Sequence, residues 1–423
     1  MCAVMNSDRA ERPTLSSLLI EPDSDAFHNN PYPTYKLLRL LHPVVYWPKG
    51  KAWLVTSHKE VVGLISDSRF SSRFKDWAGY QPSLKEDLIW RSCESEDLHA
   101  LSVEDVSRLR GLLSSYFSER NKATIRALVE QVCNQKLFRI KNTRSFDLIS
   151  DYANDVSIRV VTRLFGIPER YLPLFIQFAN AYIELLDPGK SYANSELQKR
   201  IDCLLIGRVL IQDAIRDRGR RGKGAFLIDY LIEMRHNGSL LSDTELVSLI
   251  SILAVGGLDM SRILLANTIL NVLRSGVLPL LKSDEGLWEN TVREVARYDF
   301  PQKLGTARYV LEDCWVGGVK IKKGEMVYPV IAAAQRDPAA FDRPDEFDIT
   351  RDTSRVITYD LGFHPFIGLD LAILESEVAA RRLFEVVPNL GSTVPPSYDP
   401  MHRTLRAITA YKLETNHQIR DIF

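Results

Sequence analysis

Residues 359–368 read Tyr-Asp-Leu-Gly-Phe-His-Pro-Phe-Ile-Gly, so that two glycines, Gly362 and Gly368, enclose His364 and Phe366. The phenyl ring of Phe366 carries no lone pair for a metal, and the only nearby candidate to bind one in its place is His364. The proline after His364 stiffens the backbone, so turning the imidazole onto a metal would require a rebuilt loop. The stretch therefore predicts a glycine-bounded loop that does not ligate a metal.

Other segments carry short motifs in the order found in one known family. Glu294 and Arg297 form a Glu-x-x-Arg pair, which is a weak pattern alone because any helix can place such a pair three residues apart. The remaining motifs are Asn-Pro-Tyr-Pro-Thr-Tyr at 30–35, Ala-Trp-Leu-Val-Thr at 52–56, Arg-Phe-Ser at 69–71 and Arg-Asp-Pro at 336–338. With both glycines in register, they resemble the cytochrome P450 superfamily, soluble bacterial type, over nearly the whole chain.

The resemblance implies a mainly α fold with small β-sheets, namely the cytochrome P450 fold, a triangular prism built around a long central helix. Length alone suggests two or three domains. No glycine- or serine-rich linker divides the chain, so we expect one domain over residues 1–423, with residues 1–25 as a poorly ordered N-terminal extension.

Residues 242–276 form the clearest predicted helix. Ser242 and Glu245 fit a capping box at its start, and Gly276 fits its end. Such a helix is roughly 50 Å long. It is apolar nearly all round, which predicts burial, and it resembles the central helix of the family. Short strands are expected near the N-terminus and between about residues 305 and 335.

The family signature reads Phe-x-x-Gly-x-x-x-Cys-x-Gly, and Phe366 stands where its haem-binding cysteine would be. The thiolate of that cysteine pushes electron density through iron, which a phenyl ring cannot do. The resemblance is therefore to a homologue without the haem ligand. We expect no monooxygenase activity, no metal site and no cofactor, although a haem held without thiolate ligation stays open.

Two further positions depart from the family pattern. Met260, after Asp259, replaces the threonine that would help deliver protons, and Val106 replaces a histidine that would hold a haem propionate. A second interpretation is that Met260 fills core space and that the glycines at 256–257 relieve packing. Glu294, Arg297, Gly362 and Gly368 are assigned to structure.

Three basic residues, Arg110, Arg308 and His364, match the family's propionate-binding positions. Without haem, buried cations need another anion or water, so these residues predict an anion pocket. Alternatively, Arg110 and Arg308 pair with local carboxylates or reach solvent. The third position of the family's Glu-Arg-Arg cluster falls on Glu346, which would set two acids against one arginine.

Composition is that of an ordinary globular chain, with 54 basic and 54 acidic residues. Zero net charge argues against an electrostatic nucleic-acid binder. No stretch approaches the ~20 apolar residues of a membrane span, so a cytoplasmic protein is expected. The five cysteines have no paired spacing and are interpreted as reduced thiols. The basic run at 216–224 is interpreted as a solvated loop between helices.

Three functions are compatible with these residues. The chain resembles a subgroup of cysteine-less P450 homologues that activate a glycosyltransferase in natural-product pathways, which makes a glycosyltransferase or another pathway enzyme the expected partner. Alternatively, it is a haem-independent enzyme that uses Asp259 and His364 for a cyclisation, dehydration or isomerisation of a small molecule, with Arg110 and Arg308 binding a substrate anion. The third hypothesis is a residual haem protein.

Overall fold

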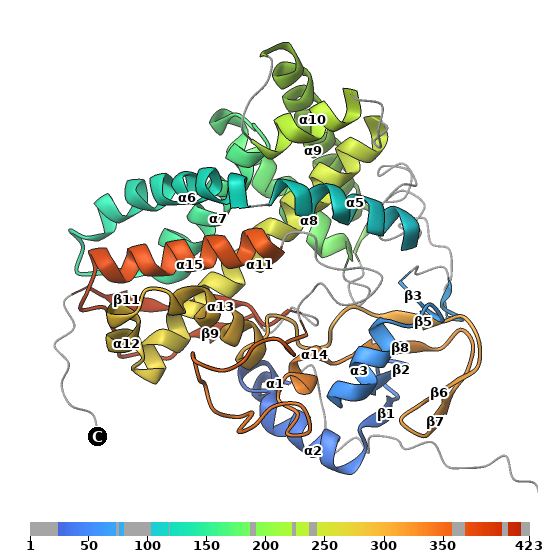
Figure 1. Cartoon of the computed structure of the whole chain (residues 1–423). Coiled ribbons are helices and arrows are strands. Elements are labelled where there is room, and N and C mark those ends of the chain that lie inside the picture. Colours follow the sequence, from blue (N-terminus) through green and yellow to red (C-terminus); the bar gives the residue numbers. More distant parts are fainter. Residues whose placement is uncertain are drawn as a thin grey trace, which may run out of the picture.

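The computed structural model describes residues 24–72, 76–79, 103–117, 119–186, 192–221, 226–236, 243–357, 369–399 and 405–415 (Figure 1). These residues are mainly helical with small sheets, as the sequence predicts. The predicted extension, 1–25, lies outside the described residues except for Ser24, whose hydroxyl caps the first helix, and Asp25, which begins it. The single domain stays a prediction.

The chain alternates long helices with short strands. The helices are α1 (Asp25–Asn29), α2 (Tyr32–Leu41), α3 (His58–Ile65), α5 (Val103–Tyr116), α6 (Glu119–Ile140), η3 (Leu148–Ala153), α7 (Asn154–Leu164), η4 (Glu169–Tyr171), α8 (Leu172–Leu186), α9 (Asn194–Arg221), α10 (Leu227–His236), α11 (Asp243–Ser275), α12 (Leu278–Ser283), α13 (Leu287–Tyr298), α14 (Ile331–Ala334) and α15 (Leu369–Val386). The strands are β1 (Val44–Trp47), β2 (Ala52–Val55), β3 (Phe70–Ser71), β4 (Ser145–Asp147), β5 (Arg308–Val310), β6 (Cys314–Val316), β7 (Val319–Ile321), β8 (Met326–Pro329), β9 (Ser397–Tyr398), β10 (Ile408–Ala410) and β11 (Lys412–Glu414).

The largest sheet joins the two regions in which strands were expected. Its order is β1-β2-β8-β5-β3, with β2 and β8 parallel and the other pairs antiparallel. Trp53, Val327 and their buried neighbours form a core beneath this sheet, separate from the core of the helices. Three two-stranded sheets pair β4 with β11, β6 with β7 and β9 with β10. The pairings of β4 with β11 and of β9 with β10 were not predicted.

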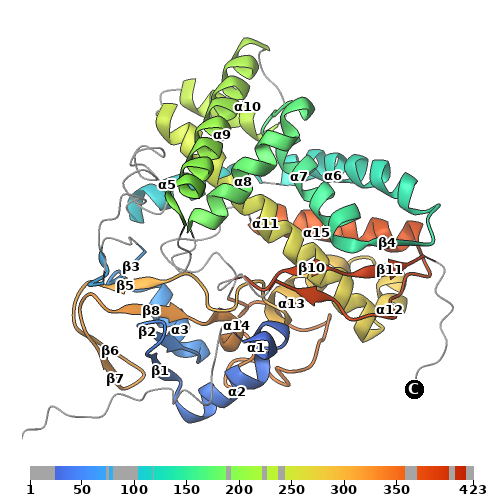
Figure 2. The same ribbon diagram turned by 180° about the vertical axis from the view of Figure 1, so that it is seen from behind.

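The helical core surrounds α11, which packs against α7, α13 and α15 (Figures 1 and 2). Its bounds confirm the helix predicted at 242–276, and Gly276 follows its end with a φ of +67°. Such a left-handed residue commonly ends a helix because glycine adopts it without strain. Ser242 lies outside the described residues, while Glu245 accepts a hydrogen bond from Arg108 of α5 at 2.5 Å.

By length and composition, α11 is also the one described helix that could cross a membrane. Residues 245–275 include a window with a mean hydropathy of 1.8. The expectation that no stretch is sufficiently apolar is therefore wrong for this helix. Because 88% of that window is buried inside the protein, its composition is explained by its place in the core.

Helices α8 and α9 pack tightly where α9 has a glycine. A Cβ atom on Gly207 would lie 2.1 Å from Cδ2 of Phe178, so only glycine admits the ring. Helix α9 continues to Arg221, and the prediction of a loop over 216–224 is therefore wrong for 216–221. Arg216 donates to Asp213 at 3.0 Å one turn earlier, an i,i+3 pair that favours helix.

Candidate functional site

The loop that carries Gly362, His364, Phe366 and Gly368 lies outside the described residues, and α15 begins directly after it. The sequence still fixes its chemistry, because the chain contains no cysteine after Cys314. Cys314 is buried at the start of β6, and burial raises the pKa of its thiol. Within the described ranges, no group of three His, Cys, Asp or Glu side chains could hold a metal ion.

Arg308 is a buried cation on β5, between strands β3 and β8. Only 6% of the residue is exposed. Its Nη1 reaches the carbonyl oxygens of Thr306 and Ala307 at 3.4 and 3.2 Å, and no described carboxylate forms an ion pair with it. Desolvation lowers the pKa of the guanidinium to about 10. The alternative that Arg308 pairs with a carboxylate or reaches solvent is therefore wrong within the described structure.

The other two predicted cations are not placed at side-chain level. Arg110 and Val106 lie on α5, but their side chains are outside the described structure, as is His364. The neighbouring Arg108 forms an ion pair with Glu245 of α11. Of the predicted anion-binding set, Arg308 alone has a described environment.

Asp259 lies buried in the middle of α11, but it is not an isolated acid. Nε of Arg262, one turn further along the helix, donates to its Oδ1 at 2.5 Å. The i,i+3 spacing therefore brings the Arg262 guanidinium onto the Asp259 carboxylate. A general acid at this position would first have to lose that partner.

Met260 and Gly257 both lie in closely packed surroundings. Met260 belongs to a small buried cluster with Ile263, Leu405 and Ala407. A Cβ atom on Gly257 would lie 3.3 Å from Cγ2 of Val161 on α7, which is tighter than ordinary contact. The core-filling interpretation of this segment agrees with these contacts.

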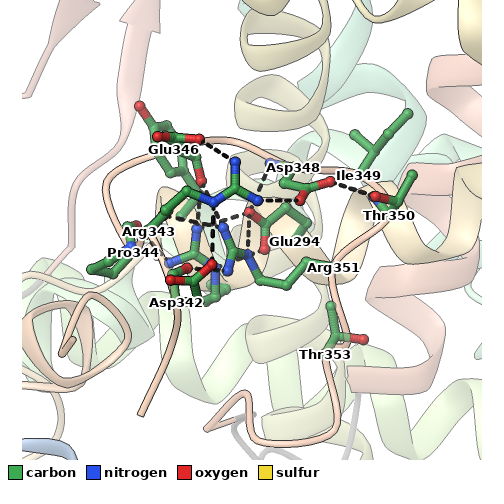
Figure 3. A network of polar contacts seen from close by, with 12 residues as sticks. Glu294, Asp342, Arg343, Pro344, Glu346, Asp348, Ile349, Thr350, Arg351 and Thr353 are labelled. Atoms are coloured by element: carbon green, nitrogen blue, oxygen red, sulfur yellow. Dashed lines mark hydrogen bonds and ion pairs between the residues drawn. The ribbon is translucent and has the colours of Figure 1, made fainter. Parts of the chain in front are cut away.

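Glu294 and Arg297 form a fully buried ion pair on α13. Nε and Nη2 of Arg297 donate to the two carboxylate oxygens of Glu294 at 2.7 and 2.8 Å. The guanidinium also donates to the carbonyl oxygens of Gln335, Pro344 and Glu346 at 2.8 to 3.0 Å. The pair therefore ties α13 to the segment before α15, as a structural role requires (Figure 3).

The third member of this cluster is Arg351, and the assignment to Glu346 is wrong. Nε of Arg351 donates to Oε1 of Glu294 at 3.2 Å, whereas the Glu346 carboxylate turns outward to Arg343 at 2.8 Å (Figure 3). Two acids do not face Arg297. Six of the ten residues from 342 to 351 are Asp, Glu or Arg, and spacing alone did not distinguish which of them points inward.

A second buried cluster was missed by sequence reasoning. Oδ1 of Asp299 accepts from Nη1 of Arg406 at 2.5 Å and from the hydroxyl of Tyr32 at 2.9 Å. Burial is the main cause that raises the pKa of Tyr32. No local sequence signal linked these positions, because they come from three distant parts of the chain.

Glu375 on α15 is a third missed group. It is fully buried, and burial raises the pKa of its carboxyl to about 8. The hydroxyl of Ser157 on α7 donates to its Oε1 at 2.5 Å, while Oε2 has no partner in the described part of the chain. The only sequence signal for this buried carboxyl was a charged residue on an otherwise apolar helix face.

Comparison with known proteins gives a consistent result. The family model for cytochrome P450 matches residues 286–413. Epothilone C/D epoxidase of Sorangium cellulosum is 30% identical over 395 residues, 92% of this chain and 94% of that protein. 6-Deoxyerythronolide B hydroxylase of Saccharopolyspora erythraea is 30% identical over 378 residues, 87% and 91% of the two chains. The structure of epothilone B-bound cytochrome P450epoK matches with a TM-score of 0.86 at 29% identity, covering 94% of this chain and 100% of that one.

Proposed function

The chain belongs to the cytochrome P450 family, and from that premise we propose that it keeps the family's fold without haem-thiolate chemistry. The observation that carries the proposal is Phe366 at the position of the haem-binding cysteine, in a chain without any cysteine after residue 314. The relatives named above are an epoxidase and a hydroxylase, and those activities belong to them.

Haem is the cofactor that family members normally bind, and the residues of this chain fit only part of it. When ligated by a cysteine thiolate, haem supplies oxygen activation. Arg308 suits a carboxylate such as a propionate, because it is a buried cation for which no carboxylate among the described residues forms an ion pair. The position that would ligate the iron does not fit, because Phe366 offers no donor atom. We therefore assign no thiolate-ligated haem and derive no reaction step from it.

The role we propose is that of an accessory protein, a pseudoenzyme that activates a glycosyltransferase in natural-product biosynthesis. Two relatives are named for epothilone and 6-deoxyerythronolide B, which supports a setting in secondary metabolism. A retained fold with a deleted metal ligand agrees with function by binding rather than by chemistry. We also propose that the protein is cytoplasmic and that it binds neither nucleic acid nor a membrane.

Retention of haem without thiolate ligation is the second candidate, and Arg308 favours it. A haem-independent enzyme that uses Asp259 and His364 on a ligand in the former cavity ranks below it. That mechanism depends on the Asp259 carboxylate, which already forms an ion pair with Arg262.

The first experiment compares the wild type with Phe366→Cys after expression with added haem precursor. We expect little iron in the wild type and no thiolate-type absorption band of the reduced protein under carbon monoxide. Phe366→Cys restores the missing donor, so it should gain iron and such a band if the haem cavity has persisted. A wild type with stoichiometric, thiolate-type haem would contradict the proposal.

The accessory role needs a separate experiment. The glycosyltransferase encoded nearest to this chain is expressed alone, with this chain, and with an unrelated P450 as control. We expect soluble and active transferase only with this chain. Equal transferase activity in all three preparations would exclude the accessory role, whatever the haem content.

A further inference from the structure

Two buried polar atoms beside Asp299 have no hydrogen-bond partner among the described residues. They are Nε of Arg406 and Oδ1 of Asn267, whose residues are 6% and 0% exposed. Nη1 and Nη2 of the same guanidinium donate to Oδ1 of Asp299 and to the carbonyl oxygen of Asn29, at 2.5 and 2.9 Å. Nδ2 of Asn267 donates to the carbonyl oxygen of Asp299 at 2.9 Å. Asp299 therefore holds both side chains in place, while one polar atom of each stays without a protein partner.

The hydroxyl of Tyr398 is a third such atom. Its ring packs 4.0 Å from Cζ of Arg406. Burial raises the pKa of this hydroxyl and the charge of Arg406 lowers it, yet the oxygen makes no hydrogen bond of proper geometry within the described ranges. Asn267 lies on α11, Tyr398 on β9 and Arg406 before β10, which contacts α11 (Figure 2). Since buried polar atoms are nearly always hydrogen-bonded, three around one ion pair indicate a further partner.

The three atoms need a partner that both donates and accepts hydrogen bonds. Nε of Arg406 can only donate, Oδ1 of Asn267 can only accept, and the Tyr398 hydroxyl can do either. Turning the Asn267 amide over would set its oxygen against the carbonyl oxygen of Asp299, so this contact fixes its orientation.

Charge excludes an ion as that partner. The Arg406 guanidinium would repel a cation, and Oδ1 of Asn267 would repel an anion. The Asp299 carboxylate already balances the positive charge of Arg406, so no net charge is left to attract either ion. A small neutral molecule with both a donor and an acceptor fits, and water is the smallest. Buried waters typically bond to about three polar groups that have no other partner, which is the number found here.

We propose that a buried water molecule binds between α11 and the segment before β10, accepting a hydrogen bond from Nε of Arg406 and donating one to Oδ1 of Asn267. The Tyr398 hydroxyl is its third partner. Leu405, the residue before Arg406, packs with Met260 of α11 in one buried cluster. The water therefore joins α11 to the C-terminal segment next to that cluster and fixes their separation. The proposal is independent of haem content and of the accessory role.

Crystallography of the full chain, at a resolution that shows ordered waters, tests the proposal directly. We expect the density of one water molecule within about 2.7–3.2 Å of both Nε of Arg406 and Oδ1 of Asn267. Well-ordered side chains without such density would overturn the proposal. A direct hydrogen bond between Arg406 and Asn267, or density with the scattering of a heavier ion, would overturn it as well.

Magnetic relaxation dispersion of the water signal counts long-lived internal waters in solution. Asn267→Leu removes the acceptor and should lose about one such water per molecule relative to the wild type. Tyr398→Phe removes only a hydroxyl and should shorten the residence time of that water severalfold. Tyr32→Phe is the matched control, because its hydroxyl donates directly to Asp299, and it should change neither quantity. Thermal unfolding confirms that each variant is folded. Unchanged water counts in Asn267→Leu, or an unchanged residence time in Tyr398→Phe, would contradict the proposed site.

Discussion

At Arg308, burial and charge oppose each other. The guanidinium meets two peptide carbonyls of its own segment and no described carboxylate. Burial lowers its pKa from 12.5 to about 10, which corresponds to roughly 3 kcal/mol of unfavourable free energy at any pH below that value. Natural proteins rarely leave such a group unpaired, and an anion that binds here would relieve the conflict.

Replacing Arg308 by methionine should change the melting temperature in a direction that tests this conflict. In protein free of haem and other ligands, Arg308→Met should leave the melting temperature unchanged or raise it, because a desolvated charge is exchanged for an apolar chain of similar length. Thermal unfolding in a buffer of non-coordinating anions is the measurement. A fall of several degrees would mean that a bound anion already neutralises Arg308 in the purified protein.

Glu375 predicts a dependence of stability on pH. Folding raises the pKa of its carboxyl from 4.5 to about 8, so the folded state holds the extra proton between these values. The free energy of unfolding should therefore fall as pH rises from about 5 to 8, by up to ~1.4 kcal/mol per pH unit. Glu375→Gln removes the titration and should be more stable than wild type at pH 8. Glu385→Gln, on the exposed side of α15, should keep the wild-type slope.

Among the helices, two glycines of α9 should respond in opposite ways to replacement by alanine. Gly207 lies under the ring of Phe178, whereas a Cβ atom on Gly219 would meet nothing within 4 Å. Alanine is favoured over glycine in helices by about 1 kcal/mol. Gly219→Ala should therefore raise the free energy of unfolding by up to that amount, while Gly207→Ala should lower it by ~1–3 kcal/mol through overpacking. Urea denaturation measures both, and equal gains would disprove the α8–α9 contact.

The segment from 342 to 351 offers a matched pair of arginines. Arg351 reaches the buried Glu294, while Arg343 is 58% exposed and pairs with exposed acids. Arg351→Ala should cost ~1–3 kcal/mol, because Glu294 loses a charged donor. Arg343→Ala and Glu346→Ala should change stability by less than about 0.5 kcal/mol. A large loss in Glu346→Ala would restore that residue as a member of the cluster.

At the scale of the whole molecule, Asp299 joins distant parts of the chain. It binds Tyr32 of α2, Asn271 of α11 and Arg406 near the C-terminal strands. Asp299→Asn should lower the free energy of unfolding by ~3–5 kcal/mol, because Arg406 would remain buried without its counter-charge. The double variant with Arg406→Leu should lose less than the sum of the single losses. Additive losses would show that the two groups do not interact.

Local patterns were sufficient for the fold and for the chemistry of single residues. The apolar periodicity and Gly276 defined α11 nearly to its ends, and the motif order pointed to the family that the comparisons established. The missing donor atom at Phe366 is likewise a property of one side chain. The Met260 segment needed the structure, since packing against α7 decided its interpretation.

What each side chain can donate, accept or ligate, and which segments are helical, could be predicted from the sequence, because these properties depend on covalent structure and on neighbours within a few residues. Which charged groups meet in the folded chain could not be predicted in this way. Glu294 meets Arg351 across 57 residues, Asp299 meets Arg406 across 107, and Arg308 meets no described carboxylate at all. Charge pairing over such separations depends on how the chain packs. Burial then sets how much each pair contributes to the free energy of unfolding.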